Sequence, residues 1–199
     1  LRRLFLFIST ERTSMFLYFA LFLFFLALLG NLWLVIYFIK SNGHNPPFIA
    51  SLGKPKTEVI RQASLFLEQN PSAQTADLGC GSGSLLIPLA QKFPDHHFVG
   101  YEWDIIPYML AIFKTRHLPN VTILYRDFFQ EDLSRYQLVL CYLCTTIEEK
   151  IGNKLNAELN RNSLVISEIF KLSVLKLKQE IVVPYKIIKT KVYLYAPNK

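Results

Sequence analysis

The residue types most able to do chemistry in this chain form a glycine-rich turn after a short apolar run. Segment 77–83 reads Asp-Leu-Gly-Cys-Gly-Ser-Gly. Because glycine tolerates backbone angles that other residues avoid, such a turn can pass sharply from a strand to a helix and let a ligand approach the main chain. The first amides of the following helix have no partner within it and can donate to that ligand. A dinucleotide-binding G-x-G-x-x-G motif would require glycine where this chain has Ser84.

Two further acids close the next apolar runs. Glu102 ends the run HFVGYE and Asp127 ends the run VTILYRD. At neighbouring strand ends, the first carboxylate is suited to accept hydrogen bonds from two ribose hydroxyls and the second from an adenine amino group. Trp103 and Phe128 follow these acids and are suited to stack on or line the adenine ring. Each acid alone is more simply a solvated loop residue, but together with Asp77 they mark three successive strand ends, which favours a ligand site.

Alternating strands and helices must position these residues, because from Gln74 onward short apolar runs alternate with longer segments of helical spacing. That alternation is typical of parallel strands joined by crossover helices, in a sheet whose ligand crevice lies at the carboxyl ends of the strands. Residues 180–195 are rich in β-branched and aromatic side chains, which predicts a closing antiparallel pair with Pro184 at an edge or bulge. The expected strands are 75–79, 97–102, 121–125, 137–143 and 163–169, and the expected helices are 83–92, 104–117 and 146–160.

An uncharged apolar segment precedes this pattern. Residues 15–39 contain no Asp, Glu, Lys, Arg or His, and a helix of about 20 residues is long enough to cross the hydrocarbon core of a bilayer. A secretory signal peptide is the alternative, but the apolar stretch is too long for one and no A-x-A-like cleavage site follows it. We therefore expect residues 15–39 to form one transmembrane helix. Basic residues flank both of its ends, so charge does not choose its orientation.

Composition sets the remaining divisions of the chain. Residues 1–14 are expected to be a short N-terminal flank, and residues 40–56 a linker in which three prolines forbid a continuous helix. Residues 57–199 are the expected domain, with Thr57 as the N-cap of a helix over residues 58–68. The formal net charge is +7, but the positive residues of the domain are scattered, which argues against a nucleic-acid groove.

With these residues in order, the sequence resembles the class I S-adenosylmethionine-dependent methyltransferases, whose first motif is D/E-x-G-x-G-x-G followed by an acid at the next strand end. The resemblance covers about residues 56–195. It implies an α/β, Rossmann-like fold with a mostly parallel sheet closed by an antiparallel pair, and S-adenosyl-L-methionine as cofactor. By that resemblance the glycine-rich motif lines the methionine part of the cofactor, the second acid holds the ribose and the third holds the adenine. The implied cofactor-binding residues are Asp77, Gly79, Cys80, Gly81, Gly83, Glu102, Trp103, Asp127 and Phe128.

A narrower likeness is to the small single-pass membrane lysine methyltransferases of bacteria and mitochondria, which modify the c subunit of ATP synthase or the adenine nucleotide translocase. It implies a membrane-embedded protein as substrate. Two positions depart from that family, because residues 50–53 lack its further proline and Cys144 replaces a proline that usually follows the fourth strand. The residues that carry the likeness are the apolar span, the Pro-Phe segment 47–49, and the runs 100–102, 127–128 and 138–155.

Methyl transfer to an amine is an in-line displacement at the sulfonium methyl. Such an enzyme mainly has to align donor and acceptor and to present the lysine as a neutral amine. An unperturbed lysine has a pKa of about 10.4, which a desolvated or carbonyl-lined pocket would lower. The candidate catalytic residues follow the fourth strand and end the fifth, and they are Tyr142, Cys144 and Glu168.

The three cysteines do not indicate a metal site. Cys141 and Cys144 have C-x-x-C spacing, but structural zinc needs about four ligands and the sequence offers no second ligand pair. Cys141 lies in an expected strand, without the helix N-terminus or cationic neighbours that favour a reactive thiolate. Buried thiols in a reducing compartment are the favoured interpretation. The pair His96-His97 also lacks partners for a metal.

Four functional hypotheses stay open, one of which is a dehydrogenase that would bind a nicotinamide cofactor and not S-adenosylmethionine. The first is a membrane-anchored methyltransferase acting on a lysine of a membrane-embedded protein. The second is a non-catalytic, membrane-anchored scaffold or binding protein, and the third is a methyltransferase for a small molecule or lipid. The presence of the glycines, Glu102 and Asp127 favours an enzyme, because a scaffold does not need them. A compartment supplied with S-adenosylmethionine indicates the cytoplasmic face of a bacterial inner membrane or, as the alternative, the mitochondrial inner membrane.

Overall fold

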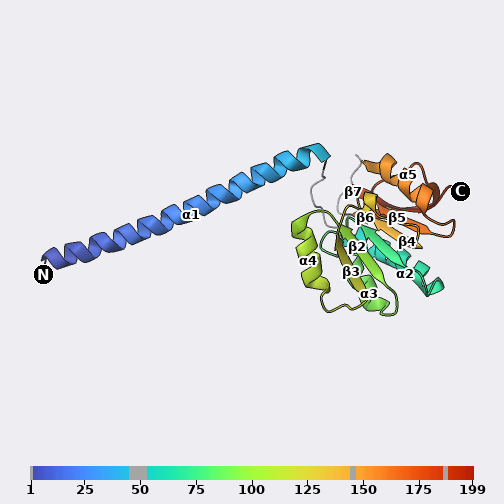
Figure 1. Ribbon diagram of the computed structural model, residues 1–199, viewed down its shortest axis with the longest axis horizontal. Coiled ribbons are helices and arrows are strands. Elements are labelled where there is room, and N and C mark those ends of the chain that lie inside the picture. The colour runs from blue at the N-terminus through green and yellow to red at the C-terminus, as the bar shows by residue number, and fades with distance from the viewer. Residues whose placement is uncertain (1, 45–52, 144–146, 186–187) are drawn as a thin grey trace. The chain divides into compact units, whose positions relative to one another are not determined.

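The chain separates into two compact units, Leu1–Pro47 and Phe48–Lys199. The computed structural model describes residues 2–44, 53–143, 147–185 and 188–199, and within them the side chains of residues 15–36, 53–143, 147–184 and 190–199 (Figure 1). The first unit consists of one helix and the second of a sheet with helices. We describe each unit by itself.

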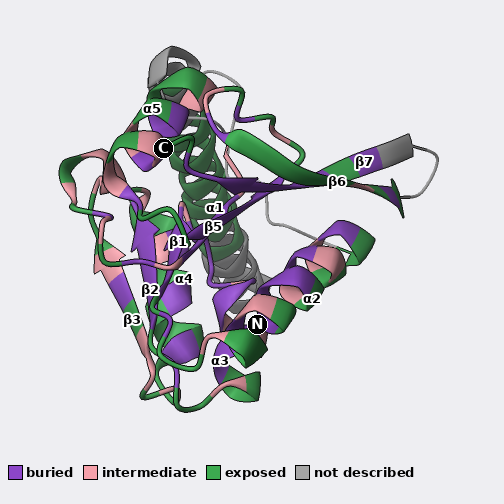
Figure 2. Cartoon of the chain, turned by 90° about the vertical axis from the view of Figure 1, so that its right-hand side faces the viewer, coloured by how far each residue is buried: buried purple, intermediate pink, exposed green. Residues whose placement is uncertain are grey.

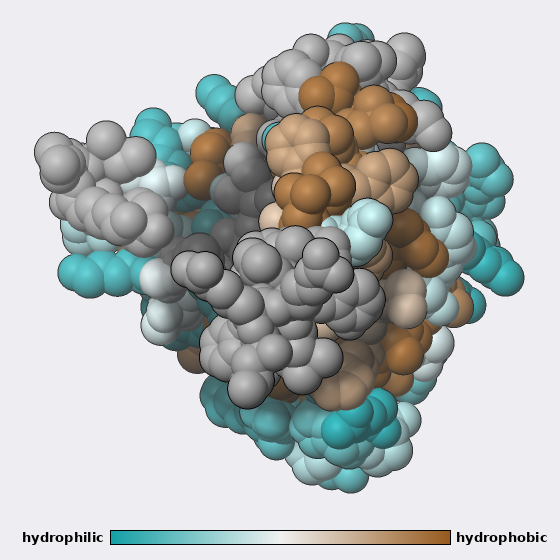
Figure 3. Space-filling view, turned by 90° about the vertical axis from the view of Figure 1, so that its left-hand side faces the viewer, coloured by the Kyte–Doolittle hydropathy of each residue, from teal (hydrophilic) through white to brown (hydrophobic). Residues whose placement is uncertain are grey.

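The first unit is the helix α1, Arg2–His44. Within it the segment Met15–Ile36 is 22 residues long, apolar and exposed, and it is the one candidate membrane span in the part of the chain that the structure describes. Its hydrophobic side chains are coloured brown in the space-filling view (Figure 3). The polar Asn31 side chain does not interrupt the helix, because its Nδ2 donates a 2.8 Å hydrogen bond to the carbonyl of Ala27. Length and composition alone support a membrane span here.

The second unit contains a seven-stranded sheet with the order β3-β2-β1-β4-β5-β7-β6. The first five strands pair in parallel, and β7 runs antiparallel to both β5 and β6. The predicted fold class, a mostly parallel sheet closed by an antiparallel pair, is confirmed. Pro184 lies in the edge strand β6, where a missing amide donor is tolerated. The strands are β1 Thr75–Leu78, β2 Phe98–Glu102, β3 Val121–Tyr125, β4 Leu138–Cys141, β5 Leu164–Glu168, β6 Lys176–Tyr185 and β7 Ile188–Ala196.

Two hydrophobic cores cover the two faces of this sheet. Consecutive strand residues alternate between them, so that Leu138 and Leu140 belong to one core and Val139 and Cys141 to the other. Helices α2, α3 and α4 pack on the first face and α5 on the second. Figure 2 shows the central strands buried and the edge strand β6 mostly exposed, and α2 and α5 buried on one side and exposed on the other. The helices are α2 Gly53–Gln69, α3 Leu86–Lys92, α4 Ile105–Thr115 and α5 Glu148–Glu158, with the short 3-10 helix η1 Phe128–Gln130.

Two predicted helix starts were wrong. The helix expected from residue 58 already begins at Gly53, and Thr57 is not its N-cap but an interior residue whose Oγ1 donates to the carbonyl of Gly53 at 3.2 Å. Pro55 does not prevent this start, because an amide in the first turn has no acceptor within the helix. The helix expected from Gly83 begins only at Leu86, since Gly83 has a φ of +77° and the turn continues past it.

Candidate functional site

Three glycines of the turn after β1 adopt left-handed backbone conformations. Gly79, Gly81 and Gly83 have φ values of +73°, +57° and +77°, a region in which side chains other than hydrogen are strained. A Cβ on Gly79 would also lie 3.0 Å from Cδ2 of Leu143. The turn therefore requires glycine for its backbone angles and, at Gly79, for close approach to the segment after β4.

Hydrogen bonds join this turn to the end of β2. The amides of Gly79 and Cys80 both donate to the carbonyl of Tyr101, each at 2.9 Å. The amide of Gly81 donates to Oε2 of Glu102 at 2.8 Å. The predicted motif and the predicted acid of the second strand are thus one connected structure.

Three amides fix the Glu102 carboxylate. Besides the bond from Gly81, Oε1 accepts from the amides of Trp103 at 2.8 Å and Asp104 at 2.7 Å. A carboxylate offers about four lone-pair positions, so about one position is left for a ligand hydroxyl. Binding two ribose hydroxyls at once would require one of these amides to give way. Burial raises the pKa of Glu102, and the amides of Asp104, Gly81 and Trp103 oppose that rise.

Gly100 is a site-forming residue whose role the sequence alone did not explain. It lies in β2, and a Cβ there would meet Sγ of Cys80 at 2.7 Å, Cδ1 of Leu86 at 2.8 Å and Cδ1 of Ile123 at 2.9 Å. Side chains essentially never approach so closely, so the glycine lets the turn pack directly on β2. Only the spatial neighbours of Gly100 show why the position is restricted.

Three carboxyl groups approach one another at the carboxyl edge of the sheet. Asp77 at β1 is only 2% exposed, and burial raises its pKa to about 8, with further contributions from Glu102 and then Glu168. Glu168, the last residue of β5, is also buried. At neutral pH Asp77 therefore favours its protonated form, and a cation bound beside it would favour ionisation. The predicted residues Glu102 and Glu168 therefore both act electrostatically on Asp77.

The third predicted acid lies at the carboxyl end of β3. Asp127 caps η1, and its Oδ1 accepts from the amide of Phe129 at 2.9 Å. The amide of Arg126 donates to the carbonyl of Glu102 at 3.1 Å, which keeps this turn beside the end of β2. Phe128 packs against Phe129 with ring centroids 4.6 Å apart. Asp127 and Phe128 therefore border the same edge as Glu102.

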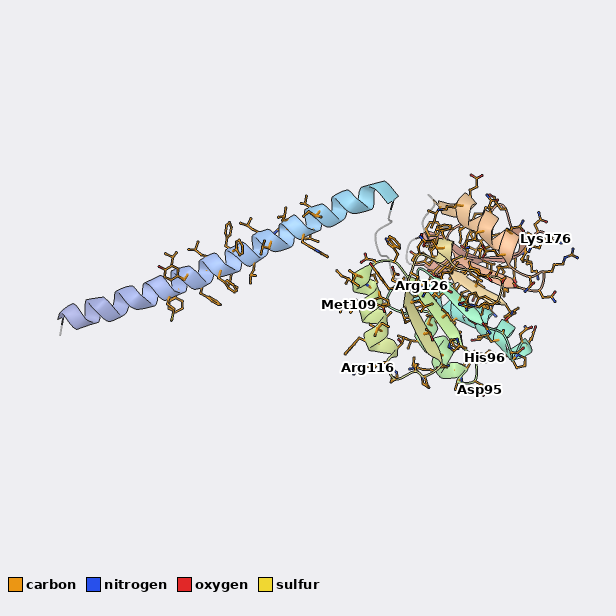
Figure 4. The ribbon with its side chains drawn as sticks, in the orientation of Figure 1. Asp95, His96, Met109, Arg116, Arg126 and Lys176 are labelled. Atoms are coloured by element: carbon orange, nitrogen blue, oxygen red, sulfur yellow. The ribbon has the colours of Figure 1, made fainter. Side chains whose placement is uncertain are left out.

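The two edges of the sheet separate the candidate residues from the histidine pair. In Figure 4, Arg126 lies at one end of the sheet and Asp95 and His96 at the other. His96 is within 3.3 Å of the carbonyl of Asn70, a contact at the amino edge of the sheet. No group of three or more metal-ligating side chains comes together among the residues that the structure describes.

The turn after β5 holds an unusual backbone conformation. Ile169 has a φ of +72°, and it is the one non-glycine residue with positive φ in the described part of the chain. The amide of Phe170 donates to the carbonyl of Glu168 at 2.9 Å, and Oγ of Ser167 donates to the carbonyl of Phe170 at 2.7 Å. A β-branched residue in this region is strained, and such strain is concentrated at functional sites.

This turn brings an unpredicted aromatic ring to the site. The rings of Tyr142, after β4, and Phe170, after β5, lie 5.8 Å apart between centroids. Phe170 was missed because nothing in its local sequence separates it from a core residue. The third candidate catalytic residue, Cys144, lies outside the described residues.

A lysine of α4 was also missed. Nζ of Lys114 donates to Oγ of Ser82 at 3.1 Å, which ties the end of α4 to the glycine-rich turn. The two residues are 32 positions apart in sequence, so only the packing of α4 reveals the pair. The other part of the turn is anchored to β2, so Lys114 adds a second attachment, from α4.

The described cysteines are buried. Burial raises the pKa of the Cys80 thiol, with additional effects from Asp77 and Glu102, and raises that of Cys141 to about 12. Both thiols are therefore protonated and unreactive at neutral pH. Cys80 serves the site through its backbone amide and through its packing beneath Gly100.

Together these residues fit an adenosyl cofactor. The left-handed glycines keep Cβ atoms away from a ligand that follows the main chain, and a buried carboxyl lies at the end of β1. Glu102 is fixed with capacity for a hydroxyl, and Trp103, 56% exposed, follows it. Aromatic and acidic groups follow β3 at the same edge. Carboxyl ends of strands are where such sheets bind their ligands.

Comparison with known families and curated proteins identifies relatives of this chain. Residues 77–179 match the family described as the ANTKMT methyltransferase domain. The chain is 31% identical over 141 residues to a protein-lysine N-methyltransferase of Saccharolobus islandicus, a match that covers 69% of this chain and 88% of that protein. The family match begins at Asp77 and so includes the glycine-rich turn.

Solved structures share the fold. An RNA methyltransferase from Salinibacter ruber in complex with S-adenosyl-L-homocysteine aligns with a TM-score of 0.60 and 23% identity, over 74% of this chain and 95% of its own. Magnesium protoporphyrin IX methyltransferase from Synechocystis with bound S-adenosylmethionine aligns with a TM-score of 0.56 and 15% identity, over 76% and 87%. At these identities the likeness concerns the fold alone.

Proposed function

Because the chain belongs to the ANTKMT methyltransferase domain family and is an S-adenosylmethionine-dependent methyltransferase, we propose that it methylates a lysine side chain of a membrane-embedded protein. The observation that carries the lysine assignment is the 31% identity to a protein-lysine N-methyltransferase over 88% of that relative. The apolar segment Met15–Ile36 supports the membrane part of the proposal.

We propose the following roles for the residues at the cofactor side. S-adenosylmethionine supplies an electrophilic methyl group when bound. The turn Gly79–Gly83 lines its methionine part, where ionised Asp77 would balance a positive charge. Glu102 accepts from a ribose hydroxyl, and Asp127 with Phe128 and Trp103 borders the adenine. The hydrogen bonds that three backbone amides donate to Glu102 support this role, because they fix its carboxylate before the ligand arrives.

At the acceptor side we propose that residues after β4 and β5 receive the lysine. The rings of Tyr142 and Phe170 would line its methylene chain and exclude water, which lowers the pKa of the amine. Once the ammonium group has lost a proton to water, Glu168 would accept a hydrogen bond from the neutral amine and hold its nitrogen lone pair in line for the transfer. Cys144 stays a candidate because it follows the same strand.

Anchoring supports this choice of substrate. A helix that spans the bilayer through Met15–Ile36 confines the domain to the membrane surface, so the encounter with a membrane-embedded acceptor becomes a tethered one with a raised effective concentration. We propose the cytoplasmic face of a bacterial inner membrane, with the mitochondrial inner membrane as the alternative. The c subunit of ATP synthase is the first candidate substrate.

The test is transfer of labelled methyl from S-adenosylmethionine into membranes of a strain lacking the protein, with wild type compared against Asp77→Ala. We expect labelled methyl-lysine in a small, very apolar protein with wild type only. Label in another membrane protein would retain the activity and reject the c subunit, and label in the lipid extract would reject lysine as the acceptor. A folded protein that labels nothing and does not bind the cofactor would support the scaffold alternative.

A further inference from the structure

Helix α4 exposes an apolar surface that the catalytic site does not use. Its residues Pro107, Ala111 and Thr115, four apart, are buried against the sheet. The remaining sides are apolar as well, and six of their residues are between 41% and 63% exposed. In Figure 4 the side chain of Met109 points away from the sheet. We call these six residues the α4 face: Ile105, Ile106, Met109, Leu110, Ile112 and Phe113.

The composition of this helix differs from that of a solvated one. A surface helix of a soluble domain normally has charged or polar residues on its outer side. The helix Ile105–Thr115 reads IIPYMLAIFKT, without an acidic residue and with one lysine in its last turn. Contiguous exposed apolar residues of this kind mark surfaces that are covered by a partner or a membrane.

Aromatic residues continue the α4 face toward the cofactor side. Trp103, one residue after Glu102, and Tyr125, the last residue of β3, are both more than half exposed. The ring of Tyr125 lies 5.2 Å from that of Tyr108 in α4. The apolar surface therefore reaches the carboxyl edge of the sheet, where the candidate site lies.

Cations border this surface. Cζ of Arg116 lies 4.1 Å from the centroid of the Phe113 ring, and Lys114 occupies the last turn of α4. Arg126 follows Tyr125 at the end of β3. Apolar and aromatic groups edged by Lys and Arg are typical of helices that lie in a bilayer interface, where the cations meet anionic headgroups.

The covalent connection keeps this surface close to the bilayer. Residues 37–44 continue α1 and rise about 12 Å. Residues 45–52 can extend by at most about 28 Å whatever their conformation. If the span crosses a bilayer, Gly53, where the domain begins, lies within about 40 Å of the bilayer surface, so lipid is within reach of an apolar face of the domain.

We propose that the α4 face lies in the membrane interface and turns the carboxyl edge of the sheet toward the bilayer in which the substrate is embedded. This inference rests on the proposed membrane anchoring. Lipid is favoured over a protein partner because the face combines apolar residues, exposed aromatics and bordering cations with a tether that ends in the membrane. Because Trp103 lies between the α4 face and Glu102 in the sequence, the proposed cofactor site would lie at a similar distance from the bilayer as this face.

Two tryptophans make the proposal measurable in the full chain. The sequence contains only Trp33, in the apolar span, and Trp103, beside the α4 face. The variant Trp33→Phe, reconstituted in vesicles of phosphatidylcholine and phosphatidylglycerol, reports on Trp103 alone. Lipids brominated at increasing acyl depth then quench its emission. We expect a blue-shifted Trp103 emission, quenched most by bromine near the headgroup and less when phosphatidylglycerol is omitted.

Matched variants separate this inference from the anchoring on which it rests. Met109→Glu with Phe113→Glu, in the Trp33→Phe background, should abolish the quenching, whereas Leu65→Glu on exposed α2 should leave it unchanged. The variant Trp103→Phe reports on Trp33. Quenched Trp33 with unquenched Trp103 overturns the interface proposal and leaves the anchor intact. Unquenched Trp33 overturns the anchor itself. Protection of Trp103 only after a membrane protein is added would assign the face to that protein instead.

Discussion

The amide of Gly81 donates a 2.8 Å hydrogen bond to Oε2 of Glu102, so the turn after β1 and the acid that ends β2 hold one another in position. The two residues are 21 positions apart in sequence. This bond, with those from Trp103 and Asp104, sets the carboxylate before any ligand binds. Preorganised groups of this kind avoid the cost of ordering on binding. The hydrogen bond between Gly81 and Glu102 therefore connects the order of the ligand-free site to its proposed affinity for S-adenosylmethionine.

Replacing Glu102 by Gln tests this link. The amide keeps one acceptor oxygen, but its NH2 group faces a backbone donor, so at least one charge-assisted hydrogen bond is lost. Such bonds contribute about 1.5–3 kcal/mol, and we expect S-adenosylmethionine affinity to fall by about 10- to 100-fold. Isothermal calorimetry measures it. Glu131→Gln, at an exposed ion pair with Arg126, is the control, and equal affinities for both variants would contradict the role of Glu102.

Gly100→Ala should destabilise the domain. The added Cβ would collide with Cys80, Leu86 and Ile123, and overpacking of this kind costs about 1–3 kcal/mol. Denaturant unfolding followed by circular dichroism measures the change. In Gly30→Ala the Cβ meets nothing within 4 Å, so this variant should unfold at the wild-type denaturant concentration. An unchanged midpoint for Gly100→Ala would refute the close packing of the turn on β2.

The raised pKa of Asp77 predicts that the free energy of unfolding of the cofactor-free protein falls as the pH rises. Its folded-state pKa, about 8, lies above its ordinary value of 3.8, so the folded state holds the proton more tightly than the unfolded state. The resulting stabilisation is complete below about pH 4 and is lost as pH rises through about 8. Asp77→Asn should flatten this dependence in the cofactor-free protein. Denaturation midpoints between pH 5 and 8.5 measure it, and parallel curves for the two proteins would exclude Asp77 as the cause.

Cofactor binding should release a proton near pH 7. A positively charged ligand beside Asp77 favours its ionised form, so binding drives the proton off and affinity rises from pH 6 to 8. Calorimetry in buffers of different ionisation enthalpy counts the proton. Asp77→Asn should bind without this release. If wild type also releases none, Asp77 does not neighbour the charged part of the cofactor.

Phe170→Ala should affect the acceptor more than the donor. The substitution removes the ring that packs on Tyr142 and with it part of the proposed lysine channel. We expect the kcat/KM for the methyl acceptor to fall by about 10-fold, a loss of roughly 1.4 kcal/mol in transition-state binding. The Kd for S-adenosylmethionine should stay the same. A loss confined to cofactor binding would remove Phe170 from the acceptor side.

The sequence alone determined most of the strands, and it placed the glycine-rich turn and the acids Glu102 and Asp127 at the strand ends where the structure has them. The predicted strand 121–125 matches β3 at both ends, and the other four of the parallel set differ by at most two residues at an end. The hydrophobic period and the spacing of glycines are local properties of the sequence, so they can be recognised without knowledge of the fold. The starts of the helices were predicted less well. Pro55 is compatible with the first turn of a helix and Gly83 with a left-handed turn, and the residue type alone does not decide whether these conformations are adopted.

Only the tertiary structure decided which side of α4 faces outward and what surrounds each acid. A helix that is apolar on all sides reads from its sequence as buried, and its exposed face appears only once Pro107, Ala111 and Thr115 are found against the sheet. The raised pKa of Asp77, the restriction at Gly100 and the contact between Tyr142 and Phe170 depend on distances between segments far apart in the chain. Local patterns determine which elements form, whereas burial and electrostatic coupling arise from the packing of those elements.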